Sequence, residues 1–165
     1  MEYWDVYDAQ GNRTGRVKPK GAAFAPDERH LAMEAWIING RGEILLQRRS
    51  DACELLPGLW GLTTGRMLAG EDSRAGCVRE VWEELGLALR PEEPRLLRRI
   101  IRSDLIWDVY RIDREADLAA LRLQPEEVSD VRWVTPAGLR AMVRAGEVFE
   151  YPEIYALLDE VASGK

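Results

Sequence analysis

The stretch GRMLAGEDSRAGCVREVWEELGL, residues 65–87, crowds three glutamates, Glu80, Glu83 and Glu84, into five positions. On a helix that advances about 100° per residue, these carboxylates fall within an arc of roughly 100° on one face. Like charges at these spacings repel one another and weaken a helix. We therefore expect a compensating positive charge, and a divalent cation is the economical candidate.

The same stretch predicts an amphipathic helix over about 72–85. Gly86 is well placed to end it, because glycine readily takes the left-handed conformation that follows many helices. Arg79 is a charged donor that can reach a carboxylate in the preceding loop and brace loop against helix. The side opposite the glutamates is apolar and should face the core; it consists of Ala75, Val78, Val81, Trp82 and Leu85.

The composition restricts the class of protein. A chain of 165 residues fits one domain, 1–165, that is large enough to bury a real core. Its net charge of −6 disfavours nucleic acid polymers and anionic membrane surfaces as partners. With only 2 cysteines, no membrane-spanning apolar run and no apparent export signal, we expect a cytoplasmic protein without a disulfide framework.

The remaining sequence alternates strand-like and helical segments. A leading hairpin is expected over 1–17, where Gly11 and Asn12 supply the turn. Thr135 and Pro136 have the residue types of a helix N-cap and first helical position. This mixture predicts an α+β fold, an α/β/α sandwich around a mixed sheet. The expected strands are 30–38, 43–49, 59–64, 95–102, 105–112 and 130–134, and the further helices 114–123, 137–144 and 150–162.

Read as a pattern, residues 65–87 match G-x5-E-x7-R-E-V-x-E-E-x-G-L, which fixes nine positions over 23 residues. This resembles the signature box of the Nudix hydrolases, and every defined position is matched. The resemblance implies an α/β/α sandwich and hydrolysis, by metal-activated water, of a diphosphate joined to another moiety, X. It makes Glu80, Glu83, Glu84 and the Gly65 carbonyl ligands of Mg²⁺, or of Mn²⁺ as a substitute, with Glu71 and Arg79 as supporting residues.

Members of this family often draw a further carboxylate, as ligand or general base, from a loop before a late strand. The loop 124–129 offers Glu126 and Glu127. We favour Glu127, because its spacing to Trp133 resembles that in the family.

Residues for binding X are predicted from polar side chains in strands. Glu34 interrupts an apolar strand, so it lines a pocket or lies at a polar sheet edge. Of Arg48 and Arg49 at the next strand end, we expect Arg49 to reach a substrate phosphate. Trp60 could stack on a ring, although a core position fits equally well. Asp104, with Asp108 and Tyr110 along the same strand, is a further candidate for polar pocket contacts.

The leading hairpin and the segments LWGLTTGRMLAGE and RWVTP resemble the subgroup related to isopentenyl-diphosphate isomerase. The isomerases use a cysteine in the strand before the box and histidine metal ligands. Here that strand has Leu62, Thr63 and Thr64, and the only histidine is His30. Hydrolysis is therefore favoured, with an isomerase and a non-catalytic nucleotide sensor as alternatives. X stays unspecified, and the hairpin and last helix are candidate surfaces for a homodimer.

Overall fold

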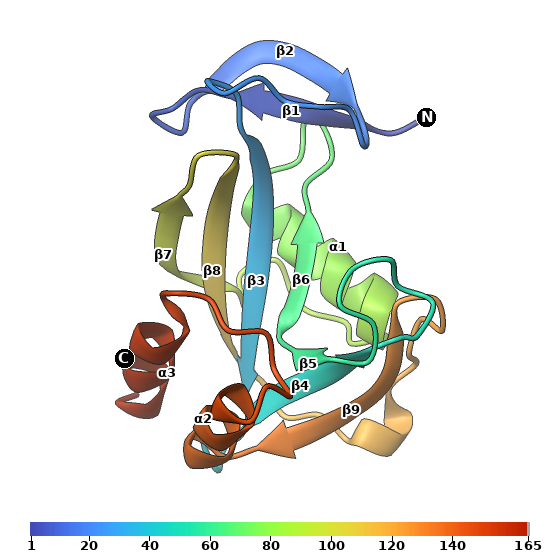
Figure 1. Ribbon diagram of the computed structural model, residues 1–165. Coiled ribbons are helices and arrows are strands. Elements are labelled where there is room, and N and C mark those ends of the chain that lie inside the picture. Colours follow the sequence, from blue (N-terminus) through green and yellow to red (C-terminus); the bar gives the residue numbers. More distant parts are fainter. Residues whose placement is uncertain (165) are drawn as a thin grey trace.

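In the computed structural model, which describes residues 1–164, a mixed β-sheet separates two helical layers (Figure 1). Helix α1 (Ser73–Leu85) covers one face, and α2 (Pro136–Arg144) and α3 (Ile154–Ala162) cover the other. The central strand β3 (His30–Ile38) alternates between them: Met33 packs with α1, whereas Trp36 packs with α2 and α3. The expected α/β/α sandwich is confirmed.

The sheet runs in the order β5 (Trp60–Gly61), β4 (Ile44–Arg49), β3, β8 (Leu105–Asp113) and β7 (Arg95–Ile101). β3 and β8 are parallel, and the other pairs are antiparallel. Two more strands join from the side: β6 (Thr63–Arg66) pairs with the first half of β3, and β9 (Val128–Val134) pairs with β4. β6 therefore delivers the loop before α1 to the middle of the sheet.

The N-terminal hairpin, β1 (Tyr3–Tyr7) and β2 (Arg13–Pro19), forms a small sheet of its own across the end of β3 (Figure 1). It holds the loop before α1 by several hydrogen bonds. Ala69 N donates to Tyr3 O over 2.8 Å, and Gly70 N donates to Asp5 Oδ2 over 2.8 Å. The predicted hairpin is confirmed, and it supports the loop that leads into α1.

Two of the expected elements differ from the structure. The strand expected over 59–64 is two short strands, β5 and β6, that pair with different neighbours. The helix expected over 114–123 is wrong: it shrinks to a 3₁₀ turn, η1 (Leu118–Ala120), because backbone amides beyond it bond to Leu85 and Glu84 of α1. Among the described residues, no helix is long and apolar enough to span a membrane.

Trp82, expected in the core, is 46% exposed, so that expectation is wrong. Its ring lies under the guanidinium of Arg122, with 4.9 Å between that group and the ring centroid. Helix α1 is rotated so that Glu84 faces the sheet, where it is buried with Val81 and Leu85. The helix therefore buries a carboxylate where a purely hydrophobic pattern places tryptophan.

Candidate active site

The acidic helix begins and ends at the expected residues. Asp72 is the N-cap, and its Oδ1 accepts a hydrogen bond from Ala75 N over 2.7 Å. Gly86 follows the last turn with φ 68°, a conformation that only glycine adopts without strain. These caps fix the register of α1 and therefore the direction of its three glutamates.

The glutamates open into one cavity of about 440 Å³ between α1, β6 and the loop before β9. Gly65 of β6 forms the opposing wall. A Cβ atom at this position would lie 2.5 Å from Glu80 Cγ and Cδ, so the close approach of strand and carboxylate requires glycine. The acidic or glycine residues that line the cavity are Glu2, Gly65, Glu80, Glu83, Glu84 and Glu127.

Arg79 supplies part of the expected charge compensation. Its Nε and Nη2 donate to the two carboxylate oxygens of Glu71, over 2.7 and 2.9 Å, in a bidentate pair. Its third nitrogen, Nη1, donates to Glu80 over 2.9 Å and to Glu83 over 3.1 Å. The hydrogen bonds with Glu71 raise the pKa of Arg79, so the guanidinium stays charged. Arg79 thus braces loop against helix, and different nitrogens serve the brace and the helix acids.

Glu84 is the most enclosed of the three glutamates, with 7% of its surface exposed. Burial raises the pKa of Glu84 to about 8, and the nearby Glu80 adds to the shift. Glu84 Oε2 accepts a hydrogen bond from Gln47 Nε2 over 3.2 Å, and this amide donor carries no charge. Burial likewise raises the pKa of Glu80. Among the described residues, Glu84 therefore has no hydrogen bond from a charged donor, whereas Glu80 has one from Arg79.

The donor set fits a hard divalent cation. The cavity is lined by several carboxylates, and carboxylate oxygens are ligands that Mg²⁺ and Mn²⁺ prefer. Within residues 1–164, no three His, Cys, Asp or Glu side chains are already gathered around one metal position. Glu80 and Glu83 are instead turned to Arg79. The residues suit the cation, and their side chains must turn to receive it.

The loop before β9 brings one of its two glutamates to the cavity. Glu127 lines it, and the backbone oxygen of Glu127 is held by Ser50 N over 2.9 Å. Glu126 is exposed and is absent from the cavity wall that the described residues form. This placement supports the choice of Glu127.

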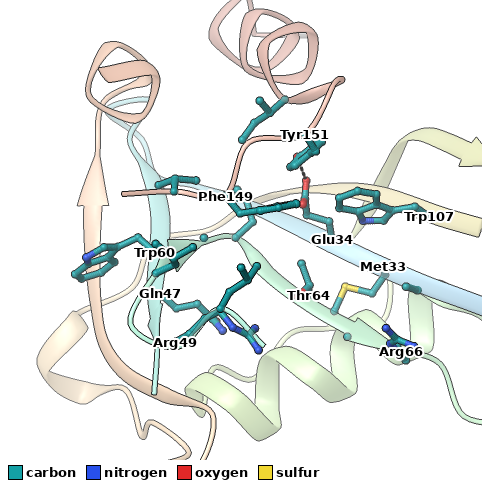
Figure 2. A pocket seen from close by; sticks show the side chains of 18 of the residues that line it. Met33, Glu34, Gln47, Arg49, Trp60, Thr64, Arg66, Trp107, Phe149 and Tyr151 are labelled. Carbon is teal, nitrogen blue, oxygen red and sulfur yellow. Dashed lines mark hydrogen bonds between the residues drawn. The ribbon is translucent and has the colours of Figure 1, made fainter. Parts of the chain in front are cut away.

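A second, mostly apolar cavity of about 280 Å³ adjoins the first (Figure 2). The two cavities have in common Arg49, Thr64, Gly65 and Arg66. Glu34 lies at the floor of the second cavity with 2% of its surface exposed. Its Oε1 accepts hydrogen bonds from Trp36 Nε1 over 2.7 Å and from the Tyr151 hydroxyl over 2.6 Å. Burial raises the pKa of Glu34 to about 7, although these two hydrogen bonds act in the opposite direction.

The other predicted binding residues are placed differently. Arg49 reaches both cavities, and its Nε donates to Leu55 O over 2.8 Å. Trp60 lines the apolar cavity, but Figure 2 shows its indole directed away from the centre. The ring stacks with the Arg132 guanidinium at 4.4 Å from the centroid. Asp104 lies in the turn between β7 and β8 and lines neither cavity of the described chain.

Asp108 and Tyr110 also lie away from both cavities of the described chain. Ser73 Oγ at the start of α1 lies 2.6 Å from Asp108 Oδ2 and 2.6 Å from the Tyr110 hydroxyl. Arg99 completes the group with a bond of 2.7 Å to Asp108 Oδ1. These residues tie the start of α1 to β8, so their role is to position the helix.

Comparison with known proteins identifies the family. Residues 28–158 match the NUDIX domain family, which is most of the chain. The chain belongs to the Nudix hydrolases. Members of this family generally hydrolyse nucleoside diphosphate derivatives and generally use divalent metals such as Mg²⁺, so this protein is an enzyme that acts on pyrophosphate bonds.

Three relatives illustrate its place among Nudix proteins. An uncharacterized Nudix hydrolase of Listeria monocytogenes is 35% identical over 152 residues, which cover 92% of this chain and 90% of that protein. Isopentenyl-diphosphate Delta-isomerase of Citrobacter koseri is 29% identical over 150 residues, covering 87% and 81%. The crystal structure of DR0079 from Deinococcus radiodurans aligns with a TM-score of 0.80 at 22% identity, covering 97% and 99%. The isomerase-like resemblance is thus confirmed at lower identity than the hydrolase.

Sequence reasoning missed several residues around this Nudix site. The hairpin, which precedes the matched region, contributes Glu2, Trp4 and Lys20 to the acidic cavity. Trp4 Nε1 is the one buried side-chain polar atom of the described residues without a hydrogen-bond partner. No pattern in residues 1–27 signals this contact, because it depends on how the hairpin folds back over the sheet. Also missed in the apolar cavity were Trp107, Phe149 and Tyr151.

Proposed function

We propose that this chain is a divalent-metal-dependent hydrolase that cleaves a diphosphate linkage with water, using Mg²⁺ or, as a substitute, Mn²⁺. The single observation that carries the proposal is the acidic cavity, which is lined by carboxylates of α1, by Glu127 of a loop distant in sequence, and by Gly65. Glu80, Glu83, Glu84 and the Gly65 carbonyl would hold the cation. When bound, it would neutralise charge on phosphate oxygens and make nearby water more acidic.

The protein's own groups have separate roles in this proposal. Glu127 is the general base that takes the proton from the attacking water at a carboxylate oxygen, because it lines the cavity and is not held by an arginine in the described structure. Arg49 and Arg66, at the junction of the two cavities, bind the phosphate oxygens and orient the linkage. Arg79 keeps the loop and the acidic helix in register through Glu71.

An isomerase is the second candidate, because the Citrobacter koseri relative carries that name. Against it, β6 places Thr63 and Thr64 where the isomerases have their cysteine. His30 contacts the Arg66 guanidinium at 3.2 Å and is outside the acidic cavity wall formed by residues 1–164. A non-catalytic sensor is the third candidate. A sensor would not need all three of Glu80, Glu83 and Glu84, and because this chain retains them, catalysis is favoured.

The experiment is a substrate panel with Mg²⁺ or Mn²⁺, followed by phosphorus NMR of the products. The panel contains nucleoside di- and triphosphates, nucleotide sugars, dinucleoside polyphosphates, ADP-ribose and isopentenyl diphosphate. We expect cation-dependent release of a phosphate-containing product from at least one compound, and loss of this activity with a chelator. Isomerised isopentenyl diphosphate would support the second candidate, and tight binding without any product would support a sensor.

Matched variants test the roles of the acids. Glu84→Gln should lower kcat/KM by roughly 100-fold or more, which is about 3 kcal/mol of transition-state stabilisation. Glu127→Gln should lower kcat strongly and change the apparent affinity for the cation little. Glu126→Gln is the control. Glu126 is next to Glu127 in the chain, but its side chain is exposed and is not part of the cavity wall formed by the described residues. Near-normal turnover of the Glu127 variant would end the assignment of the base.

A further inference from the structure

Glu34 has a carboxylate oxygen that the protein leaves free. Oε1 already accepts two hydrogen bonds, from Trp36 and Tyr151. Oε2 has no hydrogen bond within residues 1–164, and it is not among the polar atoms sealed away from solvent. It therefore faces the apolar cavity, and Figure 2 shows the side chain directed into it. A free polar atom at the floor of an apolar cavity is a recognition feature, because a ligand that pairs with it is strongly preferred to one that does not.

The walls around Glu34 suit a flat ring. Trp107 and Phe149 lie on either side of the Glu34 carboxylate in Figure 2. Tyr151 joins them, with 4.7 Å between its ring centroid and that of Trp107. At the cavity mouth, Phe149 is 51% exposed and Leu56 is 42% exposed. Aromatic rings stack well on nucleobases, and an occupant of the cavity would cover these uncovered apolar side chains.

The position of the cavity limits what the ring is attached to. Its walls continue into the acidic cavity through Arg49, Thr64, Gly65 and Arg66. A ligand with its ring against Glu34 therefore extends past two arginines toward the glutamates of α1. A base joined through a sugar to a diphosphate has this order of parts.

We infer that the apolar cavity binds a nucleobase that carries an exocyclic amino group, and that this group donates a hydrogen bond to Glu34 Oε2. The inference rests on the proposed function for the position of the diphosphate. Carboxylates accept readily from the amino groups of bases. A prenyl chain would fill the apolar walls but would cover Oε2 without pairing it, which is the unfavourable way to bury a carboxylate.

Replacing Glu34 by glutamine should reverse the preference. The Trp36 indole and the Tyr151 hydroxyl both donate, so the carbonyl oxygen of the glutamine must take the place of Oε1. Its NH₂ group then faces the cavity in place of Oε2 and donates where the carboxylate accepted. A base with a carbonyl oxygen at the exocyclic position now pairs, and a base with an amino group does not.

This test and the binding measurement below are made at about pH 8.5, because Glu34 has a pKa of about 7 and its Oε2 accepts only when the carboxyl group is ionised. The test compares two matched pairs of nucleotides, cytidine with uridine and adenosine with inosine, on the wild-type enzyme and on Glu34→Gln. We expect kcat/KM to favour the amino member of a pair by tenfold or more in the wild type, and the ratio to fall or invert in the variant. Glu150→Gln is the matched control, because Glu150 is exposed and close in sequence to Phe149. Equal use of both members by the wild type, or an unchanged ratio in Glu34→Gln, would overturn the inference.

A binding measurement separates this inference from the proposed function. Cytidine and uridine monophosphates are titrated calorimetrically into the protein in the presence of EDTA, where neither hydrolysis nor a cation contributes. Tighter binding of the cytidine compound, lost in Glu34→Gln, supports base recognition even if no substrate is cleaved. Cleavage of diphosphates without any dependence on the base, or a preference for isopentenyl diphosphate, would refute base recognition and leave hydrolysis standing.

Discussion

The buried carboxyl of Glu34 should make the stability of the protein depend on pH in a defined way. Its pKa is raised from 4.5 to about 7 in the folded protein, because burial disfavours the ionised form. Between these values the folded chain binds more protons at this site than the unfolded chain does. The contribution of Glu34 to the free energy of unfolding therefore falls as pH rises through this window. At about 1.4 kcal/mol per pKa unit, the full loss is about 3 kcal/mol.

The assay is urea denaturation of wild type and Glu34→Gln, at about pH 5 and about pH 8.5. Glutamine keeps an acceptor for Trp36 and Tyr151 but cannot ionise, so the substitution removes only the pH-dependent contribution of residue 34 to the free energy of unfolding. Relative to wild type, the variant should gain roughly 2 to 3 kcal/mol between the two conditions. Other titrating groups, such as Glu84 with its pKa of about 8, are present in both proteins and cancel. Parallel pH dependence in the two proteins would refute this reasoning.

Two further predictions concern the supports of α1. Gly76→Ala should destabilise the protein by about 1–3 kcal/mol despite the better helix propensity of alanine, because its Cβ would lie 2.0 Å from the buried Met67 Sδ. Gly138→Ala, whose nearest neighbour lies at 3.1 Å, is the control, and equal thermal midpoints would contradict the prediction. Asp5→Ala removes the acceptor of the Gly70 amide, so hydrogen exchange at Gly70 should accelerate. Unchanged protection there would mean that the hairpin does not hold the loop.

The sequence predicted most of the fold because its signals were local. Gly86 was expected to end α1 and Thr135 to cap α2, and the structure places both residues in those roles. Strands over 30–38 and 105–112 were expected and correspond to β3 and β8, but nothing in the sequence indicated their parallel pairing, which joins segments far apart in the chain. The failures are non-local. Trp82 fits an apolar stripe by spacing, but the rotation of α1 is set by what lies opposite, and there Gln47 of β4 bonds to Glu84.

The candidate site divides in the same way. Gly65 and the three helix glutamates belong to one contiguous box, so their meeting in one cavity follows from a strand, a loop and a helix in sequence. The apolar cavity is assembled from β3, β8 and the segment before α3, which no sequence spacing relates. Glu34 was noticed only as a charge in an apolar strand, and its partners Trp36 and Tyr151 emerged with the fold. Asp104 shows the converse, since polar alternation alone placed it in a pocket that it does not line.

The N-terminal hairpin gives the acidic cavity a wall that lies outside the region matched to the Nudix family, which begins at residue 28. A shortened chain that starts there would keep the glutamates of α1 and the central sheet, but it would lose Glu2, Trp4 and Lys20 from the cavity wall. Glu2 and Lys20, joined over 2.9 Å at the rim, are surface residues without a place in the central sheet. Exchange or redesign of the hairpin therefore changes this wall of the cavity while the residues of the acidic helix stay the same.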